Sequence, residues 1–99
     1  METLGQKRTR FTAMIPKLIN RANELGFEIR FVPEHNKHMK KSLHYIGLAK
    51  DFDLFKDGVY LTKTEDHTPL GEYWESIGGT WGGRFGDGNH YSIEHKEVK

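Results

Sequence analysis

The sequence predicts an α+β fold, in which a small antiparallel sheet packs against an N-terminal helix and a second helix. Apolar residues recur at helical spacing within the first 25 residues, and again after residue 68. Two other segments, 27–32 and 48–55, alternate apolar and polar side chains as half-buried strands do. This mixed order of helices and strands is typical of α+β domains. A chain of 99 residues has the size of one domain, so we predict a single domain over residues 1–99.

The first helix is predicted from about residue 7 to residue 25. Its apolar side chains are spaced three or four residues apart over four turns: Phe11, Met14, Ile15, Leu18, Ile19, Ala22 and Leu25. Gly26 is well placed to end the helix, since glycine readily adopts the left-handed conformation found after many helices. Pro16 lacks a backbone N–H and favours either a kink or a later start, with Thr9 as the N-cap of a later start.

The predicted sheet begins with a strand at residues 27–32. A polar, basic segment at residues 34–41 follows and is predicted to be a loop. The alternating segment 48–55 predicts the next strand, and Lys56-Asp57-Gly58 is a turn signal before the short apolar run 59–62. The two runs together predict a β-hairpin.

The second helix is predicted to start at Thr68-Pro69, with the threonine as N-cap and the proline as the first helical residue. Gly78-Gly79 should end it. Helical spacing predicts that Tyr73 and Trp74 pack in the core. Beyond a segment rich in glycine and aromatic residues, residues 90–93 predict a last short strand.

Composition excludes several classes of function. Because the chain has no cysteine, disulfides, thiolate metal sites and cysteine nucleophiles are excluded, and any metal must be held by His, Asp or Glu. A net charge of +1 without a long basic run does not support nucleic-acid binding. No apolar stretch approaches the ~20 residues of a membrane span, and the N-terminus lacks the pattern of a signal peptide. We therefore expect a soluble protein that is made in the cytoplasm.

Two of the six histidines stand near an aspartate in segments that otherwise have a buried character. A chain reversal near Gly47 would bring His44 close to Asp51, and Asp87 lies three residues before His90 around an Asp-Gly turn. These spacings allow a metal site, but they also allow a plain charged strand residue at Asp51 and a hydrogen-bonded core histidine at His90. The remaining histidines have hydrophilic neighbours and are expected at the surface: His35, His38, His67 and His95.

Two ordered motifs resemble a family of zinc peptidases. Residues 42–51, Ser-Leu-His-Tyr-Ile-Gly-Leu-Ala-Lys-Asp, match the pattern S-x-H-x-x-G-x-A-x-D at every fixed position. Trp81-Gly82-Gly83 is followed by Asp87-Gly88-Asn89-His90, which matches W-G-G and D-x-x-H. The sequence is thus similar to the peptidases that include D-alanyl-D-alanine carboxypeptidases, vancomycin-resistance dipeptidases and phage L-alanyl-D-glutamate endolysins, and the second motif is typical of the endolysins.

The resemblance implies a fold like that of the hedgehog domain and the D-Ala-D-Ala peptidases, with one zinc ion held by His44, Asp51 and His90. Two imidazoles and one carboxylate leave the fourth position for water, which is the arrangement of a catalytic zinc site. The zinc would activate that water, and the resemblance implies that Asp87 is the general base that accepts its proton.

Four further residues are candidates for substrate contact. Ser42 could contact substrate or support a ligand, or be an ordinary serine at the edge of a strand. Trp81 could line the cleft or pack in the core, and Arg84 could meet a substrate or pair with a surface carboxylate. Asn36 stands where relatives usually carry an arginine, so a cationic group that would stabilise the developing oxyanion is missing there.

From the resemblance we expect a phage-type endolysin that cleaves the L-alanyl-D-glutamate bond in the stem peptide of bacterial peptidoglycan. Such a protein would be a monomer that accumulates in the cytoplasm of the host bacterium and acts on the cell wall after release. One alternative is a carboxypeptidase that removes terminal D-alanine. Another is a wall-binding module that holds zinc without catalysis, a possibility that Asn36 motivates.

Overall fold

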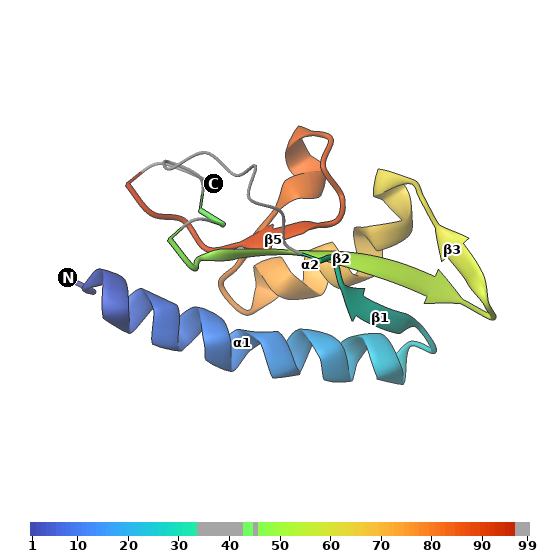
Figure 1. Cartoon of the computed structure of the whole chain (residues 1–99), viewed down its shortest axis with the longest axis horizontal. Helices are drawn as coiled ribbons and strands as arrows, with labels where there is room; N and C mark the ends of the chain where they lie inside the picture. Colours follow the sequence, from blue (N-terminus) through green and yellow to red (C-terminus); the bar gives the residue numbers. More distant parts are fainter. Residues whose placement is uncertain (34–42, 45, 97–99) are drawn as a thin grey trace.

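The computed structural model describes residues 1–33, 43–44 and 46–96. It has two α-helices and an antiparallel sheet of five strands, so the predicted α+β class is confirmed (Figure 1). In chain order the elements are α1 (Leu4–Glu24), β1 (Glu28–Phe31), β2 (Ala49–Lys56), β3 (Val59–Leu61), the 3₁₀-helix η1 (Thr64–His67), α2 (Thr68–Ser76), β4 (Thr80–Trp81), the 3₁₀-helix η2 (Gly82–Phe85) and β5 (His90–Ser92).

Helix α1 begins earlier than its apolar pattern predicts. Thr3, and not Thr9, is the N-cap: the Thr3 hydroxyl accepts the Gln6 N–H, and the Gln6 side chain accepts the Thr3 N–H in return. Pro16 lies within the continuous helix at an exposed position, so the predicted later start is wrong. Burial of the opposite face outweighs the hydrogen bond that proline cannot make. The helix ends as predicted, with Gly26 at φ +83°.

Strand β2 is the centre of the sheet because it pairs with three other strands. Strand β1 lies along one edge, in the register Glu28↔Phe55 to Phe31↔Phe52. The other edge is shared: β5 pairs with the start of β2 and β3 pairs with its end. Both strands lie on the same side of β2 in Figure 1. Their pairing with β2 leaves Phe52 and Asp53 between them. The sheet therefore forks at the middle of β2.

The β2–β3 hairpin agrees with the prediction. Its two turn residues, Asp57 and Gly58, have φ of 51° and 77°. Positive φ at both central positions is the geometry of a type I′ turn, whose twist matches that of the flanking strands. The short hairpin therefore closes without distorting β2.

Both helices pack on one face of the sheet. The core is built from apolar side chains of these layers and of the adjoining turns: Phe11, Met14, Leu18, Ala22, Leu43, Leu48, Ala49, Phe52, Leu54, Leu70, Trp74, Trp81, Tyr91 and Ile93. Trp74 is fully buried as predicted, and its indole N–H donates to the Ser92 carbonyl at 2.8 Å. Tyr73 is only half-buried. Within the described ranges, no helix is long and apolar enough to cross a membrane.

The N-terminus of α2 differs from the prediction. Thr68 is the first helical residue and His67 holds the N-cap position, because η1 runs directly into α2. The strand β4 and the two 3₁₀-helices were not predicted. They are too short to give a hydrophobic period.

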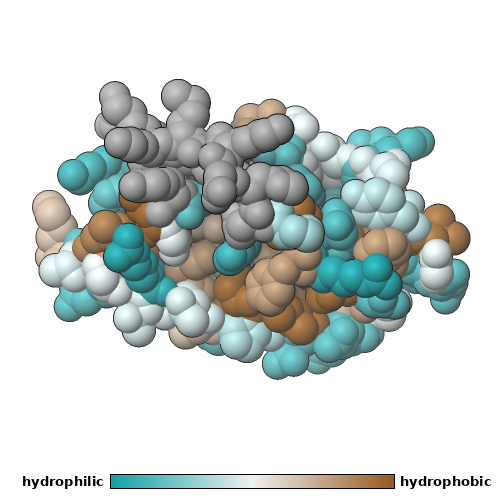
Figure 2. Space-filling model, in the orientation of Figure 1, coloured by the Kyte–Doolittle hydropathy of each residue, from teal (hydrophilic) through white to brown (hydrophobic). Residues whose placement is uncertain are grey.

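An apolar groove lies between α1 and the sheet. Figure 2 shows hydrophobic side chains gathered below the middle of the face of the molecule turned to the viewer, where α1 passes beneath the sheet. The groove has a volume of about 370 Å³, and Phe11, Ile15, Pro16 and Phe31 line it. Phe31 is 54% exposed. Its ring contacts the buried Phe52 at a centroid distance of 5.1 Å, so this wall of the groove packs against the core.

Replacing Pro16 with alanine should stabilise the protein. Alanine restores the backbone donor that proline lacks, and the exposed proline ring at the edge of the groove has little packing to lose, so Pro16→Ala should raise the free energy of unfolding by about 1–3 kcal/mol. Urea unfolding followed by circular dichroism would measure the change. Lys17→Ala, at the next exposed position, is the control and should change stability little. Equal stability of Pro16→Ala and the wild type would contradict the prediction.

Candidate metal centre

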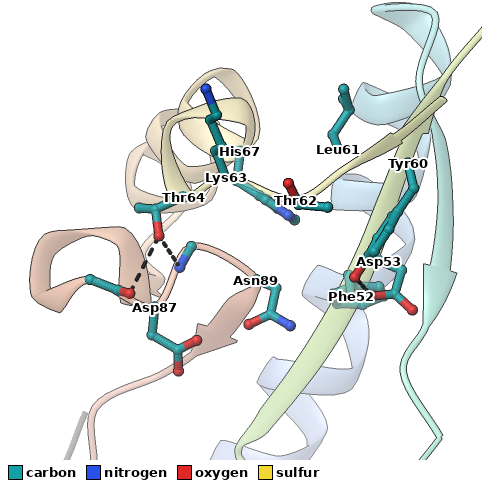
Figure 3. Close-up of a pocket in the computed structure, with 12 residues that line it drawn as sticks. Phe52, Asp53, Tyr60, Leu61, Thr62, Lys63, Thr64, His67, Asp87 and Asn89 are labelled. Carbon is teal, nitrogen blue, oxygen red and sulfur yellow. Dashed lines mark hydrogen bonds between the residues drawn. The ribbon is translucent and has the colours of Figure 1, made fainter.

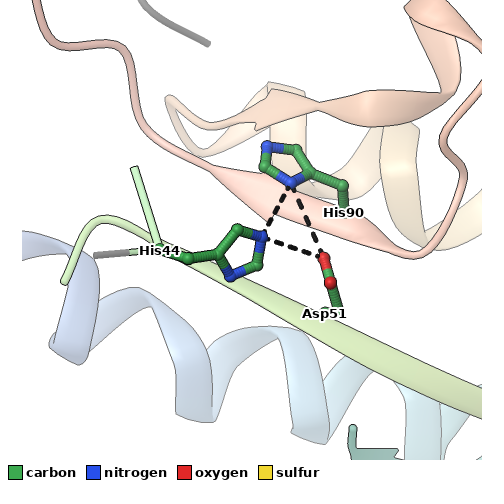
Figure 4. A group of neighbouring side chains, drawn as sticks. All are labelled: His44, Asp51 and His90. Atoms are coloured by element: carbon green, nitrogen blue, oxygen red, sulfur yellow. Dashed lines mark hydrogen bonds and ion pairs between the residues drawn. The ribbon is translucent and has the colours of Figure 1, made fainter. Parts of the chain in front are cut away.

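Three side chains that are far apart in the sequence meet on the sheet face opposite the helices. The His44 Nε2 lies 3.2 Å from the Asp51 Oδ1 and 3.3 Å from the His90 Nδ1, and the His90 Nδ1 lies 3.6 Å from the same Asp51 oxygen. Figure 4 shows the three groups converging on one point. The side chains of His44, Asp51 and His90 are 8%, 26% and 10% exposed. The cluster is therefore largely shielded from water.

The sheet places two members of this cluster. Asp51 and His90 are directly opposite each other in the antiparallel β2–β5 pair, so their side chains project on the same face. Directly opposed side chains in such a pair have Cβ atoms about 4.5–5.5 Å apart. The register alone therefore holds the carboxylate and one imidazole together.

A tight turn before β2 supplies the third member. The Leu48 N–H donates to the Leu43 carbonyl at 2.8 Å, and the Gly47 N–H donates to the His44 carbonyl at 3.2 Å. Gly47 has φ +78°, so the predicted reversal near this glycine is confirmed. On the outside of the turn, Arg8 of α1 donates from Nε to the Ile46 carbonyl at 2.7 Å. The N-terminal helix thus holds the turn that carries His44.

The cluster has the spacing and chemistry of a zinc site. Ligand atoms that are 2.0–2.2 Å from a tetrahedral zinc ion lie about 3.3–3.6 Å from one another, close to the separations in this cluster. Apart from the His44 and His90 imidazoles, the buried Asp51 Oδ1 has no hydrogen-bond partner in the part of the chain that the structure describes. Burial alone raises the pKa of Asp51, but the adjacent His44 and His90 imidazoles lower it by a larger amount. The resulting pKa of Asp51 lies well below its usual range. An ionised carboxylate and two imidazoles therefore fit Zn²⁺.

Asp87 lies outside this cluster, in a loop that is held from several directions. The Asp87 N–H donates to the Gly82 carbonyl at 2.9 Å, and the Trp81 indole N–H donates to the Gly88 carbonyl at 2.8 Å. The Thr64 hydroxyl binds this loop as well, accepting the Gly88 N–H at 3.2 Å (Figure 3). The Asp87 residue itself is exposed. The Asp87 carboxylate therefore projects from a fixed backbone, three residues before His90, and makes no ion pair with the residues that the structure describes.

The glycines after Trp81 permit this close packing. A Cβ atom on Gly82 would lie 2.2 Å from the Asp87 carbonyl oxygen and 2.7 Å from the His90 Cβ. A Cβ on Gly83 would lie 2.2 Å from the Trp81 ring. Any side chain at Gly82 would push the Asp87 loop away from the cluster, which gives the Trp-Gly-Gly segment a structural reason.

The other predicted site residues have different locations. Trp81 is 3% exposed, and its side chain is part of the core. Arg84 makes a bidentate pair with Glu75, at 3.0 and 2.8 Å, so in this structure it is the partner of a surface carboxylate. Ser42 and Asn36 lie outside the described residues, as do His35 and His38.

The prediction of a surface position for His67 is wrong. Its residue is 4% exposed, and its Nδ1 lies 2.9 Å from the Tyr91 hydroxyl oxygen. Burial lowers the pKa of His67, which therefore favours the neutral imidazole. The missed signal was helical spacing, because His67, Leu70 and Trp74 follow the i, i+3, i+7 pattern and are all buried. The polar neighbours of His67 obscured this pattern.

The turn before β2 should control metal affinity. Gly47→Ala would force an alanine to positive φ and bring its Cβ within 3.3 Å of the Arg8 side chain. Moving His44 should lower zinc affinity at least about tenfold, as loss of ligand support does elsewhere. Gly26→Ala is the matched control: it imposes the same strain of about 1–2 kcal/mol at φ +83°, with no atom within 4 Å and far from the cluster. Competition with a chromophoric chelator would measure both, and equal affinities would contradict this prediction.

The buried His67 should make stability depend on pH. The unfolded chain takes up a proton near pH 6.5, whereas folded His67 does so only at lower pH, so the free energy of unfolding should fall as pH drops below about 6.5. In His67→Gln this part of the loss should disappear. Urea titrations of metal-free protein at pH 7.5 and 5.5 would show it as a smaller pH effect in the variant. The same pH effect in both proteins would exclude this role.

Comparison with known proteins identifies a family whose model covers much of the chain. A family model described as D-alanyl-D-alanine carboxypeptidase matches residues 35–93, which is more than half of the chain. The matched segment contains both motifs, with the three clustered side chains and Asp87. No curated protein matches the chain.

Proposed function

The chain belongs to the D-alanyl-D-alanine carboxypeptidase family of peptidases, and on this premise we propose that it is a zinc metallopeptidase that cleaves the stem peptide of bacterial peptidoglycan. The observation that carries the proposal is the shielded cluster of His44, Asp51 and His90, which lies within the matched residues and has the donor set of a catalytic zinc site. Because the chain has no cysteine, it cannot use a thiolate nucleophile, and this cluster offers metal-activated water as the attacking group instead.

In this proposal, different residues of the site bind the metal and transfer the proton. His44, Asp51 and His90 would hold one zinc ion. Bound zinc supplies a Lewis acid that brings the pKa of a water molecule toward neutrality and polarises the scissile carbonyl. Asp87 would accept the proton of the attacking water and pass it to the leaving amine. The hydrogen bonds at Gly82 and Gly88 support this role, because they fix the backbone from which the Asp87 carboxylate projects.

The favoured bond is L-alanyl-D-glutamate, which makes the protein a phage-type endolysin. The motif D-x-x-H after Trp-Gly-Gly supports this choice. A second candidate is removal of terminal D-alanine, which the description of the matching family favours. Digestion of purified peptidoglycan, followed by mass spectrometry of the new termini, separates the two. Release of free alanine without cleavage of the stem would reject the endolysin assignment.

Substitutions should separate metal binding from proton transfer. Asp87→Asn should keep stoichiometric zinc but lower the rate of peptidoglycan hydrolysis about 10²–10⁴-fold, the usual contribution of a general base. His44→Ala should lose both zinc and activity. Asp57→Asn, at an exposed carboxylate in the hairpin turn, is the control and should resemble the wild type. Zinc content by atomic absorption and lysis of permeabilised cells would measure the two properties. Normal hydrolysis by Asp87→Asn would remove Asp87 from the mechanism.

A zymogram on peptidoglycan, with and without a chelator, tests the proposal as a whole. Clearing of the gel should require the metal and return when zinc is added. Clearing that persists after zinc has been removed would refute the zinc mechanism. Stoichiometric zinc without any clearing would favour the wall-binding module.

A further inference from the structure

A polar cavity occupies the fork of the sheet. Where β3 and β5 separate along the edge of β2, they leave a space of about 240 Å³ that η1 and residues 86–89 close. Figure 3 shows Asp53 and Tyr60 on one side of this fork cavity and Asp87 and Asn89 on the other. His67 and Lys63 also line it. Its walls thus carry ionisable groups, amides and hydroxyls, which suit a polar ligand.

The fork cavity adjoins the candidate metal centre. Asp53 lies two residues after Asp51 on the same strand and face, which corresponds to about 7 Å along β2. Across the cavity, Asn89 directly precedes His90. A substrate whose cleaved peptide bond lies at the cluster could therefore place the side chain of a neighbouring residue in the cavity.

Asp53 is a half-buried carboxylate with no cationic partner among the residues that the structure describes. It accepts a hydrogen bond from the Tyr60 hydroxyl at 3.0 Å. Arg30, its opposite neighbour on β1, is turned away, pairing with Glu28 and stacking over Phe55 at 4.1 Å. Lys63 is exposed and makes no ion pair within the described ranges. A cationic group entering the cavity would supply the missing partner.

His67 gives the cavity a buried hydrogen-bonding group. Its Nδ1 is taken by the Tyr91 hydroxyl, and its Nε2 has no hydrogen-bond partner in the described part of the chain. Burial keeps this imidazole neutral by lowering its pKa. When Nδ1 carries the proton, Nε2 is an acceptor, so it can receive an N–H from a ligand. Asp53 and His67 together offer acceptors from two walls.

We propose that the fork cavity is a subsite for a primary ammonium group on a substrate side chain near the cleaved bond. This proposal rests on the proposed function, and the ammonium group that it fits is that of the diamino acid in the stem peptide. For the favoured L-alanyl-D-glutamate bond, that residue directly follows the glutamate on the C-terminal side of the cleaved bond. Asp53 binds the ammonium by charge, and the Asn89 side chain and His67 provide uncharged acceptors beside it.

The test compares zinc-loaded protein on two synthetic stem peptides, one with lysine and one with norleucine at the diamino-acid position. Norleucine keeps the alkyl chain and removes the ammonium group. The wild type should have a KM about tenfold lower for the lysine peptide, as a partly exposed charge-assisted hydrogen bond gives, with similar kcat for both. Asp53→Asn should lose this preference while keeping an acceptor for Tyr60. Asp57→Asn, at the tip of the same hairpin, should retain it.

Equal KM values in the wild type, or an undiminished preference in Asp53→Asn, would overturn the proposal. A binding measurement separates its failure from failure of the proposed function. Nα-acetyl-L-lysine amide should shift the backbone amide resonances of Asp53 and Asn89 in wild-type protein, whether or not any peptide is cleaved. Nα-acetyl-L-norleucine amide should not. Equal shifts with both probes would overturn the subsite, even in a protein that proves to be an active peptidase.

Discussion

The pairing of β2 with β5 is the constraint on which the candidate site depends. Because side chains alternate along a strand, the register that opposes Asp51 to His90 also turns Phe52 and Tyr91 to the other face, where their rings pack together. A shift by one residue would bury the carboxylate and expose the core. The same burial that stabilises the sheet therefore fixes the distance between two of the three clustered groups.

The fork in the sheet follows from the same strand. β2 is longer than either partner on its shared edge, so β5 ends its pairing before β3 begins. The backbone between them is closed by loop contacts: the Phe52 N–H donates to the Asn89 carbonyl, and Thr64 binds the 86–89 loop. The loop that carries Asp87 and the cavity beside it are thus two consequences of one strand arrangement.

Local patterns predicted the long elements and the hairpin, because helical period, strand alternation and a turn signal are properties of neighbouring residues. The N-cap at Thr3 and the burial of His67 were missed, since flanking polar residues hid a continuing helical pattern in each case. Spacing alone did not decide whether the clustered histidines and aspartate form a metal site, because His44 reaches Asp51 only through a chain reversal that Gly47 permits and Arg8 supports. The resemblance of the two motifs to zinc peptidases predicted that His44, Asp51 and His90 bind one metal ion. The fork cavity had no local signal, as it forms between segments far apart in the sequence.

The small core and the candidate site share their supports. Trp74 and Trp81 each bury an aromatic ring while the indole N–H binds a backbone carbonyl, at Ser92 and Gly88 respectively. One bond anchors the end of β5 and the other anchors the loop before His90. The chain has no disulfide, so these buried contacts must hold both the fold and the geometry of the site. Loss of either indole would therefore remove a buried hydrogen bond together with the packing of its ring, so folding stability and metal binding should change together.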